Sequence, residues 1–218
     1  PEHKSNPYAN RDPRLAMSIL TNNVEFKDRT IEAWTGGRDG KGVIHATRTG
    51  YYIYKFIDPN LDLLQNRTSV HHWVIMRYAE ILLSYAEAMN EAYGPTGNVG
   101  YRLNAVRALN QVRNRVGVEM PAVPTAISKE ELREKIRNER RVELAFEDHR
   151  FWDVRRWMIA PETLGAPLRG VEITKISDEE FEYKPIEVEK RTFEPKMYLY
   201  PIPQADLNTT GWVQNPLW

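Results

Sequence analysis

The clearest helical pattern in the chain lies in residues 73–95, which read WVIMRYAEILLSYAEAMNEAYGP. Its apolar side chains recur at steps of three and four residues, the spacing that places them on one face of an α-helix. These side chains are Ile75, Tyr78, Ala79, Leu82, Leu83, Ala86 and Met89. Gly94 and Pro95 follow where the pattern stops, as expected at a helix C-terminus. The pattern predicts an amphipathic helix from Trp73 to about Tyr93.

A second helix is predicted after the loop at 96–100. Residues 103–116 repeat the apolar spacing, and Gly117 supplies a natural end. Because the connection is short, we expect the two helices to form an antiparallel pair.

A third helix is predicted to begin at Ser128. Ser128 and Glu131 have the form of a capping box, in which each side chain accepts a hydrogen bond from the backbone N–H of the other residue. We expect this helix to run at least to Phe146. After a break near Asp148, the stretch RFWDVRRW at 150–157 is expected to continue as helix.

The segments on either side of these helices have a different composition. Residues 1–72 are polar and rich in Gly and Pro, which predicts long loops around short strands. Within them, GYYIYKF at 50–56 has the aromatic and β-branched composition of a strand. Alternating pieces at 171–173 and 181–188 also predict strands. We therefore expect a loop-rich ligand-face region at 1–72, a helical scaffold at 73–160 and an irregular C-terminal region with short strands at 161–218.

The composition excludes several kinds of partner and chemistry. The chain has 30 Lys and Arg against 30 Asp and Glu, so no net charge attracts nucleic acid or anionic lipid. It has no Cys, which excludes disulfides, thiolate-bound zinc and a cysteine nucleophile. No apolar run approaches the ~18 residues that a membrane-spanning helix needs.

Two glutamates of the third helix contradict simple amphipathic patterning. Stepping about 100° per residue from Leu132 puts Glu139 and Glu143 near the centre of the apolar arc. A buried carboxylate must be paired, protonated or metal-bound, because an isolated buried charge costs several kcal/mol. We interpret the two as part of a structural ion network, whose predicted members are Glu139, Arg140, Arg141, Glu143, Arg155 and Arg156. Further candidate partners are Arg150, and Arg77, Arg107, Arg113 and Arg115 on the neighbouring helices.

Two catalytic interpretations of these glutamates are rejected. A dinuclear metal site in a helical bundle needs Glu-x-x-His on two helices, and none of the five histidines lies three residues after a Glu. A glycosidase needs a general acid with a raised pKa, whereas neighbouring arginines lower the pKa of a carboxyl group. We predict no catalytic residue, no metal site and no cofactor.

Several blocks of the sequence are recognisable once the helices are placed. Two of them are RYAEILLSYAEA at 77–88 and ERRVELAFEDHRFWDVRRW at 139–157. The others are LNQVRNR at 109–115, DPRL at 12–15, LYPIP at 199–203 and QNP at 214–216. In order and spacing, these blocks resemble the C-terminal part of the SusD/RagB family.

The resemblance implies a mainly α fold, with tetratricopeptide-like helix pairs, long irregular loops and a few short strands. It implies a lipoprotein on the extracellular face of the Bacteroidota outer membrane, which captures a glycan and delivers it to a SusC-like TonB-dependent transporter. A RagB-like protein that binds peptides is the alternative. Family members are considerably longer, so we expect an N-terminal half, carrying the lipid anchor, to complete one domain with this chain.

The matched blocks belong to the scaffold, so we expect the ligand-binding residues among the loop aromatics. Flat rings with polar edges bind sugars or peptides by stacking and hydrogen bonding. The predicted stacking residues are Trp34, Tyr51, Tyr52 and Tyr54. Arg38 and Asp39 are predicted to hydrogen-bond to ligand hydroxyls or termini. Two competing hypotheses are a glycan-cleaving enzyme that uses Glu139 and Glu143, and a helical-repeat scaffold that recognises only a protein partner.

Overall fold

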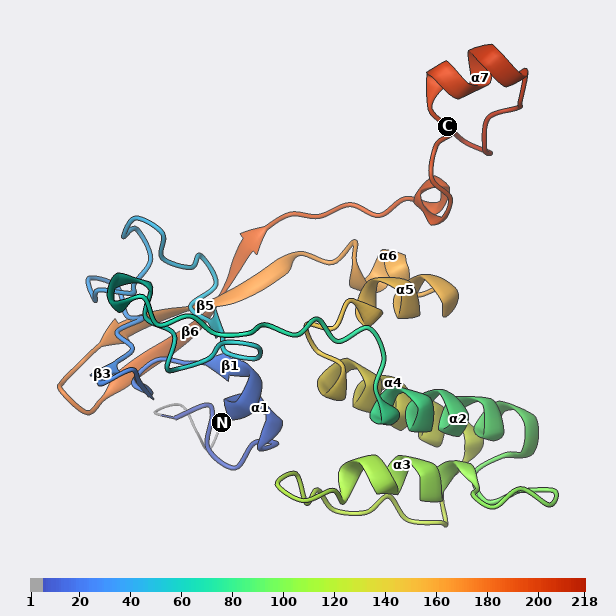
Figure 1. Cartoon of the computed structure of the whole chain (residues 1–218), viewed down its shortest axis with the longest axis horizontal. Helices are drawn as coiled ribbons and strands as arrows, with labels where there is room; N and C mark the ends of the chain where they lie inside the picture. Colours follow the sequence, from blue (N-terminus) through green and yellow to red (C-terminus); the bar gives the residue numbers. More distant parts are fainter. Residues whose placement is uncertain (1–5) are drawn as a thin grey trace.

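The computed structural model describes residues 6–218, in which helices α2 to α4 lie beside a part built of loops and short strands (Figure 1). Helix α2 (Tyr78–Tyr93) has the predicted end but begins later than Trp73. Arg77 is extended (φ −146°, ψ 162°), and its Nε lies 2.7 Å from the Glu147 carboxylate. This ion pair holds the chain extended before the helix, so Ile75, predicted on the buried face, is 83% exposed.

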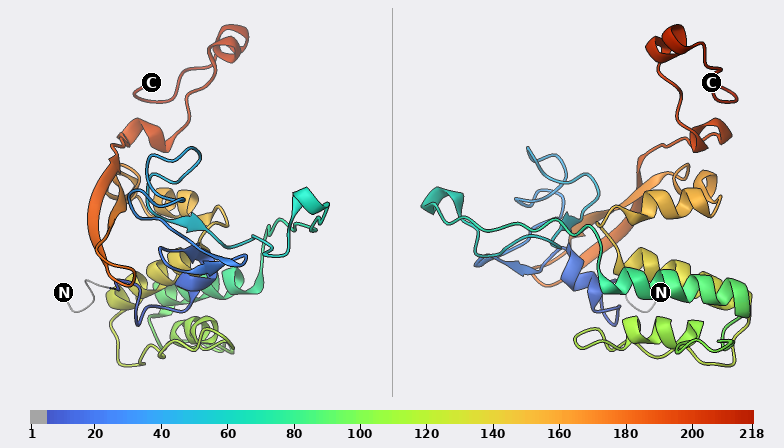
Figure 2. Two further views of the ribbon diagram at one scale, coloured as in Figure 1. Left: turned by 90° about the vertical axis from the view of Figure 1, so that its left-hand side faces the viewer. Right: turned by 45° about the vertical axis from the view of Figure 1, so that its right-hand side comes forward.

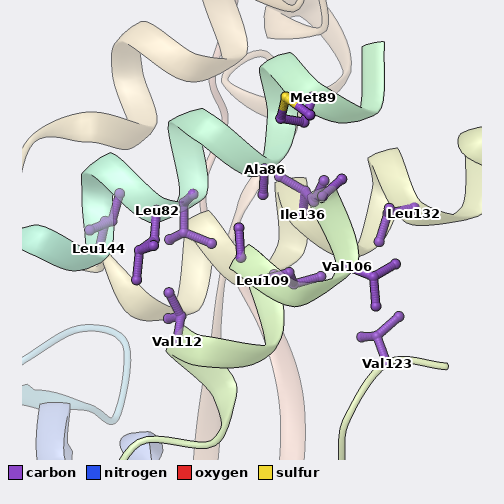
Figure 3. Packing of buried hydrophobic residues seen from close by; sticks show 13 residues of the cluster. Leu82, Ala86, Met89, Val106, Leu109, Val112, Val123, Leu132, Ile136 and Leu144 are labelled. Atoms are coloured by element: carbon purple, nitrogen blue, oxygen red, sulfur yellow. The ribbon is translucent and has the colours of Figure 1, made fainter. Parts of the chain in front are cut away.

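Helix α3 (Ala105–Arg113) packs against α2 in the opposite direction, as predicted. In Figure 3, Val112 near the end of α3 lies by Leu82 near the start of α2. The helix is shorter than the predicted 103–116. Asn104 sets its start by accepting a hydrogen bond from the N–H of Arg107 at 2.9 Å.

Helix α4 (Lys129–Glu143) begins at the predicted capping box. Ser128 Oγ accepts from the N–H of Glu131 at 3.2 Å, and the Glu131 carboxylate accepts from the N–H of Ser128 at 3.0 Å. The prediction that the helix reaches Phe146 is wrong. Phe146 has φ 64°, a left-handed conformation that an α-helix does not accommodate.

The predicted break near Asp148 is confirmed. Asp148 has φ 63° and immediately precedes helix α5 (His149–Arg156). The short helix α6 (Ala160–Thr163) follows and leads the chain towards the strands.

The core of the helical part is formed by apolar side chains of α2, α3 and α4, which point toward one another (Figure 3). Leu83, Leu109, Leu132 and Ile136 are fully buried there. Truncating one such side chain to alanine typically costs about 2–5 kcal/mol. This cluster therefore supplies much of the stability of the scaffold.

The predicted strands near the C-terminus are confirmed as an antiparallel hairpin. Strand β5 (Leu168–Lys175) pairs with β6 (Phe181–Glu189), with Ile173 opposite Tyr183. The predicted strand at 50–56 shortens to β4 (Tyr52–Ile53). The other elements before α2 are α1 (Arg14–Ser18), β1 (Ile19–Leu20), β2 (Glu25–Phe26), β3 (Arg29–Thr30) and the 3-10 helix η1 (Leu63–Gln65).

A second buried cluster joins these early loops to the hairpin. Its members are Leu20, Ile31, Ala33, Val171, Ile173 and Phe181. Two backbone hydrogen bonds attach the loops to β5. The N–H of Thr35 donates to the carbonyl of Ile173 at 2.8 Å, and the N–H of Val171 donates to the carbonyl of Thr49 at 2.9 Å. Segments far apart in the sequence thus fold around one strand.

The C-terminal segment contacts α5 through the carbonyls of Met197 and Tyr198, and beyond them it extends away from both parts of the molecule (Figures 1 and 2). It contains the 3-10 helix η2 (Pro195–Tyr198) and helix α7 (Gln204–Thr210). Among the helices of residues 6–218, none combines the length and hydrophobicity of a membrane-spanning segment. The predicted mainly helical fold with long loops and a few short strands is confirmed.

Candidate functional site

Trp34 and Tyr54, two of the predicted stacking residues, are half-buried against the second cluster. The ring centroid of Trp34 lies 5.3 Å from that of Phe181, and the Lys175 ammonium lies 5.2 Å from the Trp34 ring. Tyr54 meets Phe26 edge to face at 5.8 Å. These rings support the loops, and only part of each ring is open to solvent.

Tyr51, another predicted stacking residue, belongs to a group of three tyrosines. The Tyr8 ring meets Tyr51 at 6.2 Å and Tyr183 at 5.6 Å, both edge to face. Burial raises the pKa of Tyr8 well above its ordinary value, so its hydroxyl stays protonated. Tyr51 is thereby fixed between the segment before α1 and the hairpin.

The predicted polar residues shape the loop that follows β3. Tyr52 Oη donates to the backbone carbonyl of Asp39 at 2.8 Å. The Asp39 carboxylate lies 2.6 Å from Arg29 and accepts from the N–H of Glu32 at 2.9 Å. The hydrogen bond from Arg29 holds the pKa of Asp39 below its usual range, although burial opposes it. Arg38 pairs with Glu32 at 3.2 Å and remains exposed.

A polar cleft in the part of the molecule built of loops and short strands was not predicted from the sequence. It is an open cleft of about 870 Å³ between the turn that joins β2 to β3 and the loop that contains η1. Its lining residues are Lys27, Asp28, Pro59, Asn60, Leu61, Asp62, Leu63, Gln65 and Arg67. Its volume lies in the range of about 300–1,000 Å³ that is usual for small-ligand sites.

Both walls of the cleft are tight turns. Lys27 and Asp28 have φ values of 48° and 59°, as in the two-residue hairpin turns that favour Asn-Gly or Asp-Gly. Opposite them, Asp62 Oδ1 accepts from the N–H of Leu64 at 3.0 Å and of Gln65 at 3.2 Å. The sequence signal was weak because Lys27-Asp28 is an unusual pair for such a turn.

The cleft adjoins the predicted aromatic residues. The Lys27 ammonium lies 5.8 Å from the centre of the Phe26 ring, and Phe26 contacts Tyr54. Lys27 also donates to the carbonyl of Leu61 across the cleft. Polar side chains and aromatic rings therefore lie on the same part of the surface.

Glu139 and Glu143 face inward, as their position on the helix predicted. Their side chains are 1% and 0% exposed. Arg14 Nη1 lies 2.5 Å from Glu139 and 2.8 Å from Glu143, so one guanidinium bridges both carboxylates. Arg113 pairs with Glu139 at 2.6 Å. Arg14 was not among the partners predicted for these glutamates, because it lies far from the helix in the sequence.

A third buried carboxylate, Glu147, extends this ion network toward the loops. Arg77 lies 2.7 Å from both Glu143 and Glu147, and Lys55 lies 2.5 Å from Glu147. Arg115 also pairs with Glu143. Burial raises the pKa of the Glu143 and Glu147 carboxyl groups. The hydrogen bonds from their cationic partners outweigh this effect and leave each pKa below its ordinary value. Both glutamates are thus held ionised.

Two of the arginines predicted for this network form a separate ion cluster. Arg140 Nε lies 2.8 Å from Asp153, and Arg156 lies 2.9 Å from Asp153 and 2.5 Å from Glu87. Arg140 follows Glu139 in the helix and so projects about 100° away from it. This second cluster joins α2, α4 and α5.

The other two predicted arginines contribute to neither cluster within residues 6–218. Arg155 donates to the carbonyl of Met197 at 2.6 Å and to that of Tyr198, and so attaches η2 to α5. Arg141 lies on the exposed side of α4. Placing all four arginines in one network was therefore a wrong grouping, because neighbouring positions of a helix face different directions.

Comparison with known proteins identifies the family. The chain matches the SusD family over residues 2–218, and it belongs to that family. SusD-like protein P2 of Formosa agariphila is 34% identical over 120 residues, which are 53% of this chain and 22% of that protein. The tetratricopeptide-like arrangement of the helix pairs is shared with the solved structures of this family.

Two solved structures from Bacteroides fragilis are similar to this chain. A SusD-like protein superimposes with a TM-score of 0.80 at 31% identity, covering 97% of this chain and 40% of that chain. A SusD-like carbohydrate-binding protein gives a TM-score of 0.69 at 31% identity, covering 94% and 42%. This chain therefore spans about two fifths of the length of these relatives.

Proposed function

We propose that this chain is part of a cell-surface protein that captures a glycan nutrient and delivers it to a SusC-like TonB-dependent transporter. Membership of the SusD family over residues 2–218 supports this function, as does the similarity to a SusD-like carbohydrate-binding protein. In this proposal the protein lies on the extracellular face of the outer membrane. An N-terminal half completes the domain and carries the lipid anchor.

The cleft between the β2–β3 turn and the η1 loop is the observation that carries the glycan proposal. Asp28, Asn60, Gln65 and Arg67 offer both donors and acceptors, which suits the hydroxyl groups of a sugar. The half-buried rings beside the cleft, together with Arg38 and Asp39, extend the proposed binding surface. An aromatic ring stacks on the apolar face of a sugar through the part of its own face that is open to solvent.

The protein is proposed to bind its ligand without cleaving it. The glutamates that a glycosidase mechanism would use, Glu139 and Glu143, are buried beneath arginine side chains. A general acid needs a raised pKa, whereas the pKa of Glu143 is below its ordinary value. The two side chains support the scaffold instead.

Isothermal titration with a panel of neutral oligosaccharides tests the binding site. Replacing Asp28 and Gln65 together by Ala removes two hydrogen-bonding groups from the cleft and is expected to weaken binding about tenfold or more. The matched control replaces Asp206 and Gln204 of α7, which are exposed and distant from the cleft, and should leave the affinity unchanged. Equal oligosaccharide affinities for the two double variants would exclude the cleft as the binding site.

Further assays on the same protein distinguish glycan binding from the alternative functions. Incubation with polysaccharides should release no new reducing ends if the protein only binds glycans. Binding to a peptide panel without binding to sugars would favour the RagB-like alternative. Copurification with a membrane transporter, with no binding of any soluble oligomer, would favour a scaffold that recognises only protein.

A further inference from the structure

A second pocket lies at the start of α5, away from the cleft. It is an open depression of about 530 Å³ formed by the turn after α4 and the first turn of α5. Its lining residues are Leu144, Phe146, Asp148, Arg150, Phe151 and Trp152. Neither the fold nor the proposed function assigns a role to this pocket.

Arg150 is the cation of this pocket. Its side chain is half-buried, yet within residues 6–218 it takes part in no hydrogen bond or ion pair, whereas Arg140 on α4 and Arg156 on α5 are both paired. Burial, together with repulsion by Arg141, lowers the pKa of Arg150. An anion placed against this guanidinium would offset both effects. A planar guanidinium fork binds a carboxylate through two parallel hydrogen bonds.

The rest of the pocket offers aromatic faces to solvent. Trp152 is 57% exposed and meets Phe151 edge to face at 5.0 Å. Phe146 is also exposed and has φ 64°, a conformation that bulky residues rarely adopt and that is often found at binding sites. Asp148, on the same turn, provides an acceptor for a hydroxyl group. One cation, one acceptor and flat rings are therefore combined in one small pocket.

We infer that this pocket binds an acidic sugar, with the carboxylate of a uronic acid on Arg150 and the sugar ring on Trp152. The charge of Arg150 selects the acid, and the rings select a molecule with an apolar face. The inference names a class of ligand for the proposed glycan-binding function and rests on that function. It concerns a pocket separate from the polar cleft, so the two sites are tested by different variants.

Titration with trigalacturonate and with its neutral methyl ester tests the inference. We expect the chain to bind the acid and to bind the ester at least tenfold more weakly, because the ester cannot form the charged pair. Arg150→Gln should weaken binding of the acid at least tenfold, while Arg102→Gln, an exposed arginine on another face, should not. Trp152→Ala should weaken binding of the acid more than Trp212→Ala does. Trp212 is the control because it is a similarly exposed tryptophan in the C-terminal segment. Circular dichroism melting confirms that each variant is folded.

Three results would overturn the inference. They are equal affinity for the acid and its ester, an unchanged affinity in Arg150→Gln, and binding of an acidic peptide such as triglutamate at least as tightly as trigalacturonate. The last result would identify the pocket as a contact for protein carboxylates. If neutral oligosaccharides still bind in a manner sensitive to Asp28 and Gln65, the proposed function survives this failure.

Discussion

Arg14 and Glu139 form an ion pair at 2.5 Å across 125 residues of sequence. Arg14 belongs to α1, beside the loops and strands, and Glu139 belongs to α4 in the helical part. Both side chains are almost fully buried. The two hydrophobic clusters share no residue, so buried polar contacts such as this one connect the two parts of the molecule.

Glu143→Ala is expected to lower the free energy of unfolding by roughly 3–5 kcal/mol, because it leaves the buried Arg14 short of a partner. Chemical denaturation measures the change. The matched control is Glu182→Ala, since Glu182 is exposed on β6 and should cost little. Equal losses in the two variants would show that the ion network contributes nothing particular to stability.

Stability is expected to fall in acid below about pH 4.5. The pKa values of Glu143 and Glu147 are lower in the folded protein than their ordinary value of 4.5, so the folded state binds fewer protons than the unfolded state. The stabilisation is fully present above that value and is lost as the pH falls through the lowered pKa values. Urea midpoints measured from about pH 7 to pH 3 should show this decline, and Glu147→Gln should make it less steep. A midpoint that stays constant from about pH 5 to pH 3 would contradict the expectation.

Ser128→Ala is expected to destabilise the protein by about 1 kcal/mol. The substitution removes the oxygen that accepts from the N–H of Glu131 at the start of α4. Thermal denaturation measures the effect. Ser177→Ala, in an exposed bend of the β5–β6 hairpin, serves as the control and should leave the melting temperature nearly unchanged. If both variants melt together, the capping box is not stabilising.

Gly170→Ala is expected to disturb the attachment of the early loops to β5. A Cβ at this position would lie 2.7 Å from the carbonyl oxygen of Thr49 and 2.8 Å from Val188 Cγ2, so the backbones would have to separate. We expect a loss of about 1–3 kcal/mol, as for other overpacked sites, measured by denaturation. Gly211→Ala, with open space around it and φ 68°, tests the cost of an unfavourable conformation alone, about 1–2 kcal/mol. A free energy of unfolding that Gly170→Ala leaves unchanged would argue against close packing at this contact.

The helical part was largely predictable because its signals are local. The apolar spacing of 73–93 predicted α2, and the Ser128 to Glu131 box predicted the start of α4. The errors occur at helix ends. At the start of α2, Arg77 is held extended by an ion pair to Glu147. After α4, Phe146 adopts a left-handed conformation. Neither feature leaves a signal in the spacing of apolar residues.

The candidate site was less predictable. Trp34 and Tyr52 were predicted as loop aromatics that bind a ligand, but whether their rings support the loops or bind a ligand depends on what lies behind them. The cleft is formed by the turn at Lys27 and the loop at 59–67, which meet only in the folded protein. Arg150 appeared only as one possible partner of the glutamates, whereas its lack of a partner within residues 6–218 is visible only in three dimensions.

The spacing of apolar residues is enough to place the helices of the scaffold and to show that two carboxylates of α4 face inward, because both properties follow from the pattern along one chain segment. That Arg14 neutralises Glu139 and Glu143, and that the early loops close a second core around β5, is visible only in the folded protein. Those pairings depend on which distant segments approach one another. Helical periodicity does not specify that approach. Burial of the remaining apolar surface does, together with the need to pair each charge that becomes buried.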